Sequence, residues 1–209
     1  DGMSLAPAVL YDQLASGQTE HVAGQTFRKF VFQERLSPHA ELARLSGTPA
    51  VQTARIVTIV ESGRVELNHA FLRVVTGRNV VDNYRHGETG NLEAPLDLLE
   101  GCLLEVWGPH GDGLGCMRVT HHPTTAVPLA GFRLPFWEAT KALVEKAAIL
   151  FLPMRCIGWD VAITPSGPVL LEANMWWGPH NALAFPSRSG GGLADLLERL
   201  EEASRRGRT

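Results

Sequence analysis

Two carboxylates and one amide stand close together on a predicted hairpin toward the end of the chain. Residues 157–163 and 168–174 both read as strands, and a short turn containing proline and glycine separates them. Glu172 and Asn174 are two positions apart, so they project from one face of their strand, and Asp160 lies on the facing strand. Oxygen ligands of this kind suit magnesium held together with substrate phosphates. The hairpin therefore predicts a magnesium site, with solvated strand-end acids as the alternative.

A second predicted hairpin carries an arginine on each arm and leads into a polar loop. Residues 50–59 form the first arm with Arg55, and residues 65–75 form the second arm with Arg73. The loop at residues 82–91 contains two glycines, which could bring backbone N–H groups close to an anion. Loops of this kind often contact substrate.

Adjacent histidines at positions 121 and 122 invite a catalytic or zinc-binding interpretation. On a strand, His121 and His122 would point in opposite directions, so at most one of them could enter a site. We therefore expect neither acid-base catalysis nor zinc binding from this pair.

With the remaining segments, the chain is predicted to have a mixed α/β (α+β) fold, in which helices pack on an antiparallel sheet. Residues 1–24 read as a connector with a short helix, and residues 27–36 as a strand that Pro38 stops. Residues 136–152 have the apolar spacing of a helix. A last helix is expected over residues 193–204.

Composition narrows the function classes. The 209 residues carry a formal net charge of −3 with acids and bases interspersed, which argues against a nucleic-acid partner. No apolar run approaches the roughly 20 residues of a membrane span, and a cytoplasmic location is expected. The three cysteines form no CxxC pair, so they are expected to be reduced and mostly buried.

The hairpin motifs resemble a known enzyme family. Gly158-Trp159-Asp160-Val161-Ala162 followed by Leu171-Glu172-Ala173-Asn174 closely resembles the C-terminal metal-binding signature of ATP-grasp enzymes. Further stretches, in matching order, are similar to the sugar-transfer-associated branch of that superfamily; they are Gln33-Glu34-Arg35-Leu36, Thr53-Ala54-Arg55-Ile56-Val57-Thr58, Val81-Asp82-Asn83 and Leu134-Pro135-Phe136-Trp137. The resemblance implies the ATP-grasp fold, with ATP and Mg²⁺ bound together.

The resemblance also implies roles for individual residues. Gln33, Glu34 and Leu36 would belong to the hinge that contacts adenine. Glu41 falls where these enzymes place a ribose-binding acid, with helix capping as the alternative.

On the phosphate side, Arg55 and Arg73 would face the triphosphate and an acyl-phosphate intermediate, because a guanidinium grips phosphate oxygens. Cross-strand ion pairing is their alternative role. Asp82 and Asn83 would face the phosphates or the second substrate, or else serve as turn residues.

Aromatic residues directly after the metal-binding strand could form one wall of the acceptor pocket. They are Trp176 and Trp177, followed by His180. Packing of these rings against the sheet is the alternative.

The function implied is ATP- and Mg²⁺-dependent ligation, in which a carboxylate is activated as an acyl phosphate and captured by an amine or similar nucleophile. The expected partners are therefore small-molecule carboxylate and nucleophile substrates, and homo-oligomerisation stays open. One alternative is a phosphotransferase of the same fold that acts on a hydroxyl. The other is a non-catalytic binding module.

The nucleotide clamp of ATP-grasp enzymes also uses a glycine-rich flap and lysines from a smaller preceding domain. Lys29 is the only lysine before Lys141, and it is not accompanied by a glycine-rich loop. We therefore expect this part of the clamp to be missing. The predicted organisation is a connector at residues 1–26, the metal- and phosphate-binding domain at residues 27–186, and a linker with a helix at residues 187–209.

Overall fold

The computed structural model of the chain describes residues 12, 20–22, 25–27, 33–84, 88–109 and 116–177. The chain divides into two compact units, Asp1–Arg35 and Leu36–Thr209. Among the described residues, no helix combines the length and the apolar character that crossing a bilayer requires.

In the first unit, two short antiparallel strands lie in the region that was predicted to be a connector, residues 1–26. Strand β1 (Glu20–Val22) pairs with β2 (Gln25–Phe27). The predicted strand over residues 27–36 is wrong at its C-terminal end, because residues 33–39 form neither helix nor strand. Three consecutive exposed polar residues and Pro38, which lacks an amide hydrogen, explain why this segment joins no sheet.

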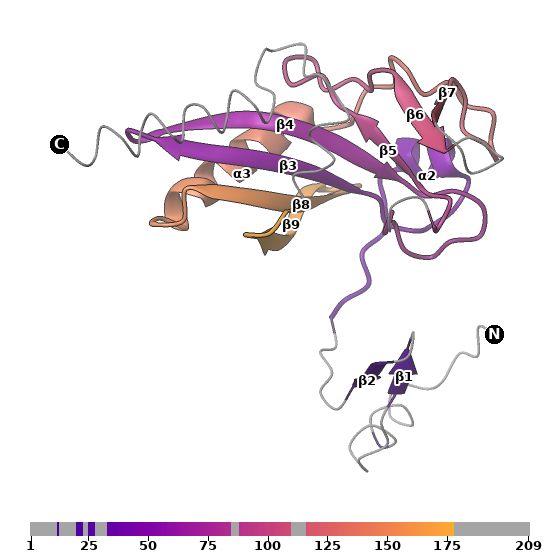
Figure 1. Ribbon diagram of the computed structural model, residues 1–209, viewed down its shortest axis with the longest axis horizontal. Coiled ribbons are helices and arrows are strands. Elements are labelled where there is room, and N and C mark those ends of the chain that lie inside the picture. Colours follow the sequence, from indigo (N-terminus) through magenta and orange to yellow (C-terminus); the bar gives the residue numbers. More distant parts are fainter. Residues whose placement is uncertain are drawn as a thin grey trace. The chain divides into compact units, whose positions relative to one another are not determined.

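The second unit is built on a five-stranded antiparallel sheet with the order β5-β4-β3-β8-β9 (Figure 1). Its strands are β3 (Thr53–Glu61), β4 (Arg64–Val74), β5 (Leu92–Pro95), β8 (Cys156–Thr164) and β9 (Gly167–Asn174). Both predicted hairpins are confirmed. β3 and β8, one from each hairpin, pair in the middle of the sheet, and this pairing brings the two sets of predicted site residues together.

The first hairpin turns through two residues with left-handed backbone. Ser62 has a φ of 49° and Gly63 a φ of 76° between the paired residues Glu61 and Arg64. Two positive φ values in a two-residue loop match the right-handed twist of the flanking strands. The pairing of β3 with β4 is therefore set locally.

Two helices belong to the described part of this unit. Helix α3 (Trp137–Leu150) lies within the predicted helix and contacts strands β3, β4, β8 and β9. The shorter α2 (Ala40–Ser46) was not predicted; His39 Nδ1 accepts a hydrogen bond from the amide of Glu41, and Gly47 ends the helix with left-handed backbone. The last predicted helix lies outside the described residues.

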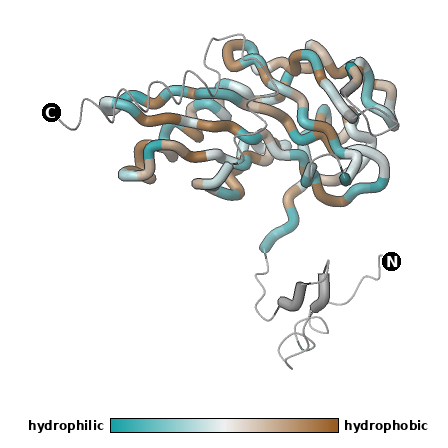
Figure 2. The backbone as a smooth tube through the Cα atoms, in the orientation of Figure 1, coloured by the Kyte–Doolittle hydropathy of each residue, from teal (hydrophilic) through white to brown (hydrophobic). Residues whose placement is uncertain are grey.

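One face of the sheet forms the hydrophobic core. Alternate strand residues such as Ile56, Leu72 and Trp159 are fully buried there and pack with Leu42 of α2 and Val144 of α3. Figure 2 shows hydrophobic residues concentrated along the central strands. Because side chains alternate along a strand, the residues between these positions point to the other face.

A smaller antiparallel pair, β6 (Val106–Pro109) and β7 (Cys116–Val119), lies between β5 and α3 in the chain. Nearby, His121 is exposed and His122 is buried, in agreement with their predicted opposite directions. His122 Nε2 lies 2.8 Å from the carbonyl oxygen of Val75, and its Nδ1 accepts from the amides of Thr124 and Thr125. These contacts give His122 a structural role.

The cysteines Cys102 and Cys156 form no disulfide, as expected, but both are half-buried where mostly buried thiols were expected.

Candidate functional site

The strand register places the predicted metal ligands and both arginines on one surface of the sheet, opposite the hydrophobic core. We call this surface the polar face. It comprises Thr53, Arg55 and Val57 on β3, His69, Phe71 and Arg73 on β4, Glu93 on β5, Gly158 and Asp160 on β8, and Glu172 and Asn174 on β9. Residues of five strands, far apart in the chain, thus share one surface.

Asp160 and Arg55 form a buried, two-pronged ion pair at the centre of the polar face. Asp160 is 5% exposed and Arg55 is 7% exposed. Arg55 donates from Nε to Oδ1 of Asp160 and from Nη2 to Oδ2 at 2.9 Å. Its third nitrogen, Nη1, donates to the carbonyl oxygen of Trp177 at 3.1 Å. All three guanidinium nitrogens of Arg55 are therefore in use.

Arg73 shares the same carboxylate. Its Nη1 donates to Oδ2 of Asp160 at 3.1 Å and to Oγ1 of Thr53 at 3.3 Å. No bond from its Nε or Nη2 to another described residue is found. Two largely buried guanidiniums thus pair with one carboxylate, and Arg73 has N–H donors that no residue in the described part of the chain uses.

Thr53 connects this network to the polar loop. Its amide and its hydroxyl both donate to Oδ2 of Asp82, the amide at 2.8 Å. Burial raises the pKa of Asp82, while the hydrogen bonds from Thr53 and the charge of Arg73 oppose that rise. Asp82 therefore anchors the start of β3 through a long-range contact and also lies in the electrostatic field of the arginines.

Asn83, predicted to contact phosphate or the second substrate, lies in the same loop with an exposed side chain. Its carbonyl oxygen accepts from Thr89 Oγ1 at 2.7 Å and from Asn91 Nδ2 at 2.9 Å. The buried Asn91 also donates to the carbonyl of Val81 and accepts from the amide of Thr76, so it organises the loop. The loop backbone is held in place while the Asn83 side chain stays exposed.

Trp177 lies directly over Gly158. A Cβ atom added to Gly158 would lie 2.4 Å from Cβ of Trp177, which is closer than atoms can approach. The Trp177 ring centroid is also 5.0 Å from that of His69. Burial and the charge of Arg55 lower the pKa of His69 to about 4, so its ring is neutral at physiological pH. Trp177 packs against the sheet, which was the alternative to a role in the acceptor pocket. Trp176 is exposed.

The three predicted metal ligands fit magnesium delivered with phosphates better than a permanently bound ion. Asp160 is the cross-strand partner of Glu172, and Asn174 is the partner of Gly158. Glu172 is exposed, and Nδ2 of Asn174 is a buried atom with no hydrogen-bond partner. The described residues contain no cluster of three His, Cys, Asp or Glu that could hold a metal alone. Two carboxylates and an amide need phosphate or water oxygens to complete an octahedral shell.

The predicted nucleotide-contacting residues have ordinary surface positions in their own units. Gln33 and Glu34 are exposed in the first unit, and Leu36 is half-buried at the start of the second. Glu41 is in the first turn of α2, where it accepts from Arg44 at 2.7 Å. This contact is an ion pair between side chains of the helix, and the side chain that caps the helix is that of His39.

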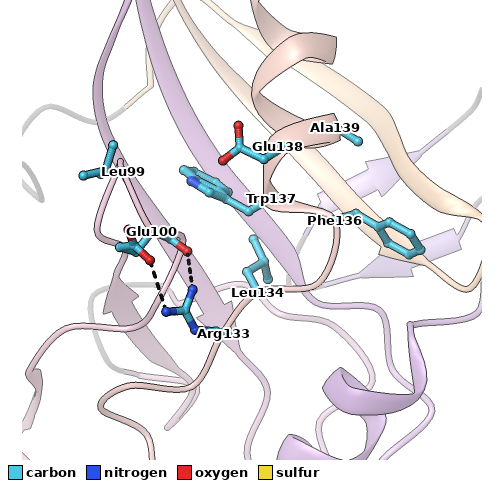
Figure 3. A pocket seen from close by; sticks show the side chains of 8 residues that line it. All are labelled: Leu99, Glu100, Arg133, Leu134, Phe136, Trp137, Glu138 and Ala139. Atoms are coloured by element: carbon cyan, nitrogen blue, oxygen red, sulfur yellow. Dashed lines mark hydrogen bonds and ion pairs between the residues drawn. The ribbon is translucent and has the colours of Figure 1, made fainter.

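A pocket of about 510 Å³ lies elsewhere, at the start of α3 (Figure 3). Trp137 and Leu134 line it together with the exposed ion pair between Arg133 and Glu100, whose atoms are 3.1 Å apart. No residue of the polar face contributes to it. This pocket therefore belongs to a different part of the molecule.

Sequence reasoning missed three contributors to the polar face. Thr53 bridges Arg73 and Asp82, Gly158 makes room for Trp177, and Glu93 lies opposite Arg73 on β5. Glu93 could have been noticed as the single acid between the apolar residues Leu92 and Ala94 of a short strand. The roles of Thr53 and Gly158 depend on long-range packing that the sequence does not display.

A mixed α/β unit built on a five-stranded antiparallel sheet with few helices is consistent with an ATP-grasp domain. The family model of the sugar-transfer-associated ATP-grasp proteins matches residues 10–199. The chain therefore belongs to the sugar-transfer-associated ATP-grasp family, as the motif resemblance suggested. Membership indicates ATP binding and an ATP-dependent, ligase-type enzyme. No significant match was found among curated proteins or among solved structures.

Proposed function

We propose that the polar face activates a carboxylate with ATP, forms an acyl phosphate and passes the acyl group to an amine or similar nucleophile. One observation carries this proposal: the two guanidiniums of Arg55 and Arg73 share the single carboxylate of Asp160. A cross-strand ion pair needs only one arginine. A second one with N–H donors to spare favours a polyanion as an additional partner.

The proposed cation ligands lie on β8 and β9 of the same surface, next to the arginines. Asp160, Glu172 and Asn174 would hold Mg²⁺ together with the nucleotide phosphates. When bound, Mg²⁺ supplies charge neutralisation at the phosphates and helps align the attacking and leaving oxygens.

The protein residues would act by orientation and electrostatics. Arg55 is held on three sides, so its guanidinium is already oriented and loses little conformational freedom when phosphate binds. Arg73 would direct its free N–H donors to the transferred phosphoryl group or the acyl phosphate. Trp177, packed over Gly158, would shield this region from water, which strengthens the interactions there.

The nucleotide-binding residues form the remaining part of the proposal. Gln33, Glu34 and Leu36 would contact adenine, Glu41 would bind the ribose, and Asn83 would approach the phosphates. The domain boundaries at residues 26 and 186 also remain proposals, as does the cytoplasmic location.

Product analysis tests the reaction. The chain is incubated with Mg-ATP and a panel of carboxylates, amines and hydroxyl compounds, while phosphate release, new amides and phosphorylated products are followed by mass spectrometry. A ligase gives ADP, free phosphate and an amide in equal amounts. A phosphorylated hydroxyl compound without free phosphate would indicate the phosphotransferase instead. Mg-ATP binding without any product from the whole panel would favour the binding module.

A further inference from the structure

Glu93 is an acid of the polar face that the proposed reaction has not yet used. It lies on β5 as the cross-strand partner of Arg73 and is 6% exposed. The neighbouring residues Leu92 and Ala94 point into the hydrophobic core, so the Glu93 side chain points to the polar face.

No hydrogen bond joins the Glu93 side chain to another described residue. The nearest arginine, Arg73, directs Nη1 to Asp160 and Thr53 instead. Burying an unpaired carboxylate costs free energy, so Glu93 does not help the fold in its ionised form. Burial of the Glu93 carboxylate costs folding free energy, and Glu93 lies on the polar face. A residue kept at such a cost beside a candidate site indicates a functional contribution.

The electrostatic surroundings support this view. Burial raises the pKa of Glu93 to about 7, and the charges of Arg73 on β4 and Arg55 on β3 limit the rise. His69, the histidine on the same face of β4, is neutral at that pH. At neutral pH the carboxyl group of Glu93 can therefore both accept and release a proton, which suits general acid-base catalysis.

Along the sheet from β9 to β5, the side chains of the polar face follow the sequence of the proposed reaction: cation binding, phosphoryl transfer and attack by the nucleophile. Proposed cation ligands stand on β9 and β8, guanidiniums on β3 and β4, and Glu93 on β5. Neighbouring strands are about 4.8 Å apart, so β5 lies about 14 Å from β8. That span accommodates a phosphoryl group with the acyl group beyond it and a nucleophile at the far end.

We propose that Glu93 is the general base for the nucleophile, taking a proton from the amine as it attacks the acyl phosphate. This inference rests on the proposed ligase function. The amine nitrogen forms a bond to the acyl carbon, and the bond from that carbon to the phosphate oxygen breaks. Phosphate leaves with the bonding electron pair. The proton lost by the nitrogen goes to a carboxylate oxygen of Glu93.

Two reactions of one acyl phosphate separate this role from the rest of the site. With Mg²⁺ and acetyl phosphate, the full chain is assayed for phosphoryl transfer to ADP, which needs no amine, and for hydroxamate formation with hydroxylamine, which does; each rate is taken as the excess over the rate without protein. The variant is Glu93→Gln. The control is Glu61→Gln, which changes an exposed acid at the tip of the β3–β4 hairpin.

We expect Glu93→Gln to slow hydroxamate formation about 100-fold. It should also abolish the rise of that rate with pH around neutrality. ATP formation should stay within about twofold of the parent, and Glu61→Gln should change neither rate. Thermal unfolding at pH 8.5 should show the Glu93→Gln variant at least as stable as the parent, because an unpaired buried charge has been removed.

Other results overturn the assignment. Equal loss of both reactions, or a lower melting temperature at pH 8.5, would make Glu93 a structural residue. Unchanged hydroxamate formation would exclude it as the base. A parent that makes ATP but no hydroxamate would refute the acceptor role of Glu93 and leave phosphoryl transfer standing. A parent that makes neither product from acetyl phosphate, and no amide from the panel of carboxylates and amines, would refute acyl-phosphate chemistry, and with it the proposed function.

Discussion

At the scale of single residues, the polar face depends on one carboxylate. Asp160 accepts hydrogen bonds from both Arg55 and Arg73, and all three side chains are largely buried. Removing the charge of Asp160 would leave two guanidiniums without an ion-pair partner, and an unpaired buried charge is costly. The residue most suggestive of metal binding in the sequence is therefore also a structural one.

Asp160→Asn should consequently destabilise the chain. We expect a loss of about 3 kcal/mol in the free energy of unfolding, measured by urea denaturation. Glu100→Gln is the matched control, because it breaks an exposed ion pair with Arg133 and should cost less than about 1 kcal/mol. Equal effects of the two substitutions would show that the buried cluster contributes nothing special.

His69 should make stability depend on pH. Its pKa in the folded chain is lowered to about 4 by burial and by the charge of Arg55. The stability linked to the neutral ring is therefore complete above its unfolded pKa of about 6.5 and is lost as the pH falls from there through about 4.

Glu93 has the opposite linkage, since its pKa is raised to about 7, so the contribution of His69 must be isolated with a variant. We expect the difference in unfolding free energy between the parent and His69→Gln to shrink by at most about 3 kcal/mol between pH 7.5 and pH 4. Denaturant titrations across this range provide the measurement. A difference that stays constant with pH would contradict the buried, neutral histidine.

At the scale of elements, the hairpin with the metal-binding signature contributes side chains to both the hydrophobic core and the polar face. Trp159 points into the core, where its Nε1 donates to Thr58 Oγ1 at 2.7 Å. Gly158 and Asp160 point to the polar face on either side of it. The alternation of a strand thus explains why a bulky aromatic residue stands between a glycine and an acid.

Gly158→Ala should displace Trp177 from its position over β8. Alanine normally improves a strand relative to glycine, but here its Cβ would meet Cβ of Trp177. We expect destabilisation of about 1–3 kcal/mol, with displacement of the Trp177 carbonyl from Arg55.

A double-mutant cycle with Trp177→Gly checks the cause, because removing the tryptophan Cβ should make the Gly158→Ala substitution nearly neutral. An undiminished cost of Gly158→Ala in the Trp177→Gly background would place the strain elsewhere.

Element prediction succeeded where local patterns were strong and failed where they were short. Both long hairpins and α3 followed from alternation, turn residues and helical spacing. The seven-residue α2 offers too few turns for a periodic signal, and its ends are set by His39 and Gly47. The strand predicted over residues 27–36 fails at its end, where residues 33–35 are exposed and polar and belong to no sheet. Strand pairing is a long-range property that alternation alone cannot supply.

At the scale of the whole molecule, the polar face is assembled from two hairpins separated by more than 80 residues, joined by the pairing of β3 with β8. The family resemblance implied that Arg55, Arg73 and Asp160 would lie near one another, and the structure brings the three side chains together. It could not predict that Asp160 pairs with both arginines, or that Glu93 lies beside them. Those features depend on strand order and burial.

Calorimetric titration of Mg-ATP into the full chain tests the central claim, that the polar face binds nucleotide through Mg²⁺. Glu172→Gln is the variant of choice, because Glu172 is exposed and its loss should leave the fold intact; Glu61→Gln is the control. We predict binding that requires Mg²⁺ and weakens at least about tenfold, or about 1.4 kcal/mol, in Glu172→Gln alone. Binding that is independent of Mg²⁺, or equally strong in both variants, would contradict a magnesium-nucleotide site on this face.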